Sequence, residues 1–212
     1  MEGYKRLLEY NAAWVERRLA ERPDYFTRHL GQQRPEYMWI GCSDSRVPAE
    51  TITGCEPGDL FVHRNVANVV VHTDFNMLSA LHFAIELGVR HVIVCGHVGC
   101  GGVKAAMGRR SHGLVLDRWL RKVKDVYHQH APSLEAIPDE DLRLQRLVEL
   151  NVVHQVQELA RTSAVQESWA REGRPWLHGW VYDIHTGKLR EVSLMRHTDL
   201  PDDIYRFERD TD

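Results

Sequence analysis

The chain has 212 residues, of which 43% are hydrophobic and 27% charged, and these proportions exclude fibrous and disordered classes of protein. The formal net charge is -3, and the basic residues are scattered rather than gathered in runs, which argues against nucleic acid or an anionic membrane as the partner. This length suits one domain with an appended arm, and we expect a small molecule as its partner.

The first residues of the sequence are charged and lack the apolar core of a signal peptide. No run of about 18 uncharged apolar residues follows, as a membrane-spanning helix would require. We therefore expect a cytoplasmic protein. In that compartment its four cysteines are thiols or metal ligands rather than disulfides, and they are Cys42, Cys55, Cys95 and Cys100.

The hydrophobic pattern predicts a series of helices and strands. Residues 4–20 have helical spacing and predict an amphipathic N-terminal arm. Strands are expected at 37–41, 60–63 and 91–95, and helices at 76–86, 114–130, 139–160 and in a shorter segment ending before Gly173. Residues 176–184 and 188–194 flank a Thr186-Gly187 turn and predict a hairpin at the sheet edge. Strands that alternate with helices indicate an α/β fold with parallel pairing.

Two glycine-containing loops follow expected strands, at residues 41–44 and 96–100. Because the carboxyl ends of parallel strands meet at one edge of a sheet, we expect the two loops to converge there. Cys42, His97 and Cys100 then supply two thiolates and one imidazole, a ligand set that suits Zn²⁺. Three protein ligands leave a tetrahedral ion a fourth position, at which water can bind and lose a proton.

A short helix is expected to begin after Cys100, with residues 103–107 in it, and its N-terminus should lower the pKa of the Cys100 thiol. Asp44 and Arg46 follow Cys42 at intervals of two residues. Arg46 can hold the Asp44 carboxylate in a bidentate pair, and Asp44 can orient zinc-bound water for attack. Alternatively, Asp44 itself completes the tetrahedron and closes the site; Arg46 competes for this carboxylate, so the two states can interconvert.

Three segments closely resemble the signature segments of β-carbonic anhydrases: Gly41-Cys-Ser-Asp-Ser-Arg-Val47, His63-Arg-Asn-Val-Ala-Asn68 and Cys95-Gly-His-Val-Gly-Cys-Gly-Gly102. The arm and the late His-Gly-Trp-Val-Tyr182 strand are similar to the bacterial members. The resemblance implies a mostly parallel four-stranded sheet with an added antiparallel edge strand and flanking helices. It also implies a dimer-swapped helical arm at 1–30 and one catalytic domain at 31–212.

The same resemblance implies an enzyme that hydrates CO₂ reversibly to bicarbonate and a proton with a zinc-bound hydroxide. One Zn²⁺ is expected per subunit, held by Cys42, His97 and Cys100, with Asp44 and Arg46 as the catalytic dyad. The implied assembly is a homodimer that often doubles to a homotetramer. Gln33 matches a glutamine of the substrate pocket that faces the metal of the partner subunit.

Trp39, Gly41, Arg64 and Tyr182 match residues with which one subgroup of the family holds bicarbonate at a second, non-catalytic site. Binding there favours an inactive form. Indole N–H, phenol O–H and guanidinium groups are suitable donors for an anion. The alternative is that Trp39 and Tyr182 are simply core residues of their strands.

Other functions remain open from the sequence. A site of this kind can also serve a hydrolase of another small heterocumulene, carbon disulfide or carbonyl sulfide, if the pocket differs in width. A non-enzymatic zinc-dependent regulator would keep the metal without turnover. A thiol redox role is less well supported, because the sequence contains no Cys-x-x-Cys pair.

Overall fold

The computed structural model describes residues 3–199 and 203–207, and the chain divides into two compact units, residues 1–33 and 34–212. In the first unit, α1 (Lys5–Glu21) is followed by a short 3-10 turn at Thr27–His29. The ring of Trp14 on α1 and the rings of Tyr25 and Phe26 beyond its end meet edge to face, and Tyr25 is buried. The apolar side chains near the start of α1 stay exposed, with Leu7 at 66% and Leu8 at 71%.

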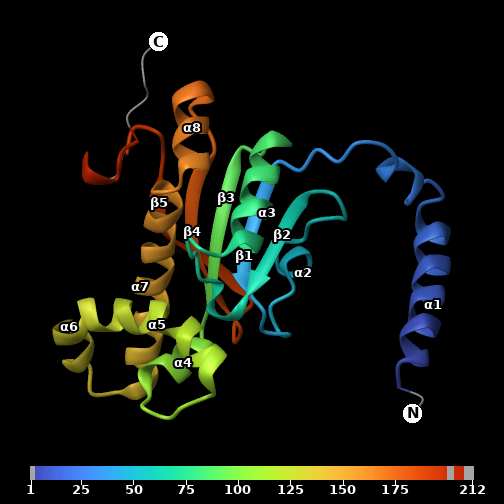
Figure 1. The fold of residues 1–212 in the computed structure, drawn as a ribbon. Coiled ribbons are helices and arrows are strands. Elements are labelled where there is room, and N and C mark those ends of the chain that lie inside the picture. The colour runs from blue at the N-terminus through green and yellow to red at the C-terminus, as the bar shows by residue number, and fades with distance from the viewer. Residues whose placement is uncertain (1–2, 200–202, 208–212) are drawn as a thin grey trace. The chain divides into compact units, whose positions relative to one another are not determined.

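The second unit is built on a five-stranded sheet with the order β2-β1-β3-β4-β5 (Figure 1). The first four strands in this order are parallel to their neighbours, and β5 pairs antiparallel with β4. The strands are β1 (Tyr37–Cys42), β2 (Leu60–Asn65), β3 (His91–His97), β4 (Trp176–Asp183) and β5 (Lys188–Met195). This architecture confirms the predicted four-stranded parallel sheet with an antiparallel edge strand.

Three helices of this unit begin at a side chain that satisfies a free amide of their first turn. Asp74, Asp139 and Thr162 each accept a hydrogen bond from the first turn that follows. The helices are α2 (Ala49–Thr53), α3 (Phe75–Glu86), α4 (Gly101–Met107), α5 (Leu114–Gln129), α6 (Ala131–Glu135), α7 (Glu140–Ala160) and α8 (Ser163–Glu172). The expected helices correspond to α1, α3, α4, α5, α7 and α8, whereas α2 and α6, of five residues each, are too short to leave a periodic pattern.

Among the described helices, none combines the length and the apolar character needed to pass through a membrane.

Alternation along the strands divides the core between the two faces of the sheet. Met38 and Ile40 of β1 pack with Leu81 of α3 and Val156 of α7, the helices that lie across one face in Figure 1. Trp39, between them, points to the opposite face. Because β1 and β3 are adjacent and parallel, their carboxyl ends lie side by side, which places the loops that follow them together.

Candidate metal centre

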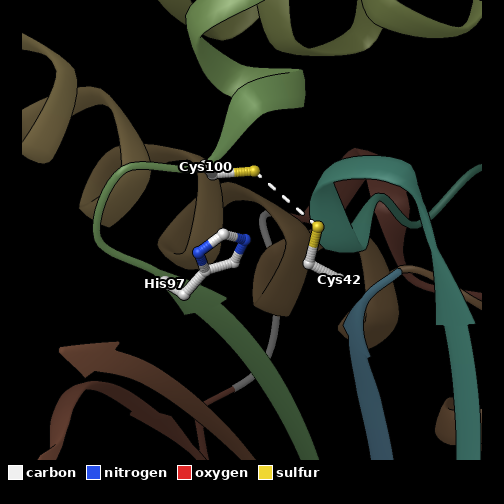
Figure 2. Close-up of side chains that lie close together, drawn as sticks. All are labelled: Cys42, His97 and Cys100. Carbon is white, nitrogen blue, oxygen red and sulfur yellow. Dashed lines mark hydrogen bonds between the residues drawn. The ribbon is translucent and has the colours of Figure 1, made fainter. Parts of the chain in front are cut away.

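Cys42, His97 and Cys100 converge at the carboxyl edge of the sheet (Figure 2). Cys42 is the last residue of β1, His97 is the last residue of β3, and Cys100 precedes the first turn of α4. All three residues are buried, and one ligand atom from each lies within 4.8 Å of the other two. The two Sγ atoms are 3.8 Å apart. The predicted convergence of the two loops is therefore present.

This geometry fits a tetrahedral metal ion. With Zn–S bonds of about 2.3 Å, two thiolates on one tetrahedral zinc stand about 3.8 Å apart. The Nδ1 atom of His97 lies 3.1 Å from the carbonyl oxygen of Val98. A carbonyl only accepts hydrogen bonds, so Nδ1 carries the proton of the neutral imidazole and Nε2 carries the lone pair. That Nε2 is buried and has no hydrogen-bond partner in the part of the chain that the structure describes.

The two thiols share one short contact, which shifts their pKa values in opposite directions. This contact lowers the pKa of Cys42 to about 4, and His97 and the backbone amides of Ala67 and Asp44 act in the same direction. The same contact, together with burial, raises the pKa of Cys100. The amides of Val103 and Gly102 in the first turn of α4 lower the pKa of Cys100, as predicted for the helix N-terminus, but the contact with Cys42 and burial outweigh them. The lowered pKa of Cys42 favours its thiolate form, which is the form that binds a metal.

Asp44 is held by Arg46. Its Oδ1 accepts from the Arg46 amide at 3.0 Å and from Nε at 2.9 Å, while Oδ2 accepts from Nη2 at 2.7 Å. This guanidinium holds the pKa of the Asp44 carboxyl well below its usual range. Oδ2 also lies 3.7 Å from Nε2 of His97, so the carboxylate borders the three ligand atoms while remaining paired with Arg46.

The residues expected to bind bicarbonate lie on three strands, β1, β2 and β4. The indole Nε1 of Trp39 is buried without a partner among the described residues, and a Cβ at Gly41 would stand 2.3 Å from it. Arg64, the register partner of Gly41, donates to the carbonyl oxygens of Cys42 and Asp44. Tyr182 is partly buried against the cluster that contains Trp39.

Gln33 is exposed and belongs to the unit of residues 1–33, so its place relative to the cysteines remains a prediction. The sequence prediction missed a different pair, Asn151 and Gln155, which are both 1% exposed on α7. Two amides one helical turn apart within an otherwise apolar stripe were the available signal.

The comparisons with known proteins agree with this site. The family model described as carbonic anhydrase matches residues 37–189. The chain belongs to the carbonic anhydrase family. A carbonic anhydrase of Emericella nidulans is 43% identical over 194 residues, which cover 91% of this chain and 85% of that protein. One of Pseudomonas aeruginosa is 35% identical, covering 84% and 86%.

Solved structures of β-carbonic anhydrases have the same fold. One from Sordaria macrospora, described as tetrameric, has a TM-score of 0.86 at 40% identity and covers 90% of this chain and 97% of its own. One from Coccomyxa, in complex with acetazolamide, has a TM-score of 0.87 at 35% identity and covers 92% and 89%. The chain is therefore an enzyme of the β class, a lyase.

Proposed function

We propose that this chain catalyses the reversible hydration of CO₂ to bicarbonate and a proton, using one zinc ion per subunit held by Cys42, His97 and Cys100. The observation that carries the proposal is the buried, unpartnered Nε2 of His97 beside two sulfur atoms 3.8 Å apart. Two soft ligands and one imidazole favour zinc over the hard cations, which prefer oxygen ligands.

Zinc, when bound, supplies a Lewis acid that lowers the pKa of water and so provides a nucleophile near neutral pH. Two features of the chain favour binding of this ion. The Val98 carbonyl keeps the ring of His97 oriented, and the lowered pKa of Cys42 favours its thiolate form. Two thiolates reduce the net charge at the site, which makes a further proton acceptor useful.

Asp44 is that acceptor in our proposal. The three hydrogen bonds from Arg46 fix the carboxylate and keep it ionised, while Oδ2 remains on the side of His97. An ionised carboxylate in this place accepts a hydrogen bond from the attacking water and orients its lone pair toward CO₂. Arg46 is thus a positioning residue, because it acts through Asp44.

Stopped-flow CO₂ hydration tests the function. We expect hydration by the zinc-loaded protein, its loss after chelation, and its loss in Cys42→Ser. Cys55→Ser is the matched control, because Cys55 is a free thiol outside the ligand set, and this variant should keep its activity. Zinc-loaded protein that hydrolyses carbon disulfide or carbonyl sulfide but leaves CO₂ unchanged would contradict the proposal, and so would bound zinc without any turnover.

We further propose the bacterial-type regulation, in which bicarbonate binds at Trp39, Gly41, Arg64 and Tyr182. Among the described residues the buried N–H of Trp39 has no acceptor, and a bound bicarbonate would supply one. Arg64 supports the coupling, because its guanidinium holds the carbonyls of Cys42 and Asp44. An anion that draws this guanidinium away would loosen the backbone at residues 42–44 and let Asp44 leave Arg46 for the metal.

We also propose the dimer with swapped arms, doubled to a tetramer. Exposed apolar side chains on each unit support it, because Leu7 and Leu8 of α1 and Phe75 and Val115 of the second unit would otherwise face water. The substrate-pocket role of Gln33 and the cytoplasmic location belong to the same set of proposals.

A further inference from the structure

Two buried amide side chains on α7 form a continuous hydrogen-bond chain with a loop near the cysteines. Gln155 Nε2 donates to Asn151 Oδ1 at 2.9 Å, and Asn151 Nδ2 donates to the carbonyl oxygen of Ala67 at 3.1 Å. Gln155 Oε1 accepts from the amide of Val70 at 2.8 Å. Burying two amides in a helix–sheet interface is unfavourable unless they are paired, so this arrangement fixes the loop to the helix.

The loop that they hold has an unfavourable backbone. In the turn Val66–Asn68, Ala67 has φ +64° and Asn68 has φ +47°, so two successive residues with side chains occupy the left-handed region. Ala67 has no polar side chain with which to stabilise this conformation locally. Such a turn persists only where its surroundings impose it, and the Asn151 contact falls on the carbonyl of Ala67 itself.

The same turn touches both cysteine-bearing elements. The turn contacts β1, which ends in Cys42, and Ala67 belongs to the same buried cluster as Cys42 and Cys100. On its other side the turn packs against α4, where a Cβ at Gly102 would stand 2.8 Å from Val66 Cγ1 and 3.2 Å from Ala67 Cβ. A shift of the turn would therefore disturb both the end of the strand that carries Cys42 and the helix that follows Cys100.

We infer that Asn151 and Gln155 are positioning residues of the metal centre, which hold the Val66–Asn68 turn against the strand that ends in Cys42 and the helix that follows Cys100. Residues that support metal ligands from outside the ligand set fix the directions of the ligating atoms, and this changes how tightly the metal is bound. The inference rests on the proposed binding of a metal by Cys42, His97 and Cys100, and it assigns α7 the role of supporting those ligands from outside.

The test uses the full-length protein with its zinc replaced by Co²⁺, whose absorption reports thiolate ligands directly. We compare the wild type with Asn151→Leu and Gln155→Met. The new side chains are close in size to Asn and Gln but lack the amide group. Both variants should bind zinc about tenfold more weakly in competition with a chelator. They should also shift the thiolate-to-cobalt charge-transfer band and the pH midpoint of activity.

Leu159→Ala is the matched control, because Leu159 is fully buried on the same helix two turns further on and packs in the other core cluster. It should lower the stability of the fold while leaving the cobalt band and the zinc affinity unchanged. An amide variant with the zinc affinity and band of Leu159→Ala would overturn the inference; Gln155→Met supplies this comparison if Asn151→Leu does not fold. A wild-type protein without any thiolate-to-cobalt band would instead refute the metal site itself.

Discussion

Oδ2 of Asp44 lies 3.7 Å from Nε2 of His97, close to the ligand atoms yet turned toward the guanidinium of Arg46. The carboxylate therefore has two competing cations to satisfy: Arg46, and whichever metal the cysteines and His97 hold. In the mechanism proposed above, the carboxylate acts on water while it is paired with Arg46 and excludes water when it binds the metal. The strength of the Asp44–Arg46 pair would then govern how much of the enzyme is active.

Replacing Arg46 by Gln should favour the state in which Asp44 blocks the metal. We expect the rate of CO₂ hydration near neutral pH to fall about 100-fold, because Asp44 loses its orientation as a proton acceptor. The loss should shrink at alkaline pH, where hydroxide competes better with the carboxylate for the metal. The measurement is kcat/KM against pH, and the expected result is a higher pH midpoint than that of wild type.

The control for this experiment is Arg146→Gln, since Arg146 pairs with Glu149 on the exposed side of α7. It should leave the profile unchanged. A flat pH profile in both wild type and Arg46→Gln would show that Asp44 does not compete for the metal.

Trp39→Phe should abolish inhibition by bicarbonate while retaining most of the uninhibited activity, because it removes the unpartnered indole N–H and keeps an aromatic ring in the core. Trp180→Phe is matched to it. Trp180 packs edge to face on Trp39 at 6.3 Å, but its own N–H already donates to Glu191. The measurement is the initial rate of each variant at increasing bicarbonate concentration. Unchanged inhibition in Trp39→Phe would argue against this binding site.

Much of the fold could be predicted from the sequence, because its main elements carry strong local signals. The apolar runs of β1 and β3 and the ligand types that follow them were enough to place Cys42 and His97 at one edge. The Val66–Asn68 turn was not predictable in this way. Nothing in the residue type of Ala67 signals a left-handed conformation, and the hydrogen bond to its carbonyl comes from Asn151, 84 positions further along the chain.

Two adjacent glycines offer a comparison that probes this turn from the side of α4. A Cβ at Gly102 would clash with Val66 and Ala67, whereas a Cβ at Gly101 would have no atom within 4 Å. Gly102→Ala should therefore lower the free energy of unfolding by about 1–3 kcal/mol and weaken metal binding, because the turn must move. Gly101→Ala should be neutral or slightly stabilising. Urea denaturation and chelator competition measure both quantities, and equal behaviour of the two variants would contradict this packing.

Histidine burial predicts how stability depends on pH. Burial holds the pKa of His154 below its ordinary value, with Glu158 acting in the opposite direction. The unfolded chain takes up a proton there near pH 6.5, before the folded chain does, so stability is lost as the pH falls below about that value. His154→Gln should make the decline in the urea midpoint between about pH 7.5 and 5.5 shallower. The exposed His82 provides the control, as His82→Gln, and a decline in His154→Gln as steep as in wild type would refute this origin.

The most direct test of the account is X-ray absorption at the zinc edge of the purified, active enzyme. Coordination by Cys42, His97 and Cys100 predicts two sulfur neighbours at about 2.3 Å and nitrogen or oxygen neighbours at about 2.0 Å. Cys100→Ser should remove one sulfur from that shell. A zinc shell without sulfur, or active enzyme without bound metal, would contradict the central claim.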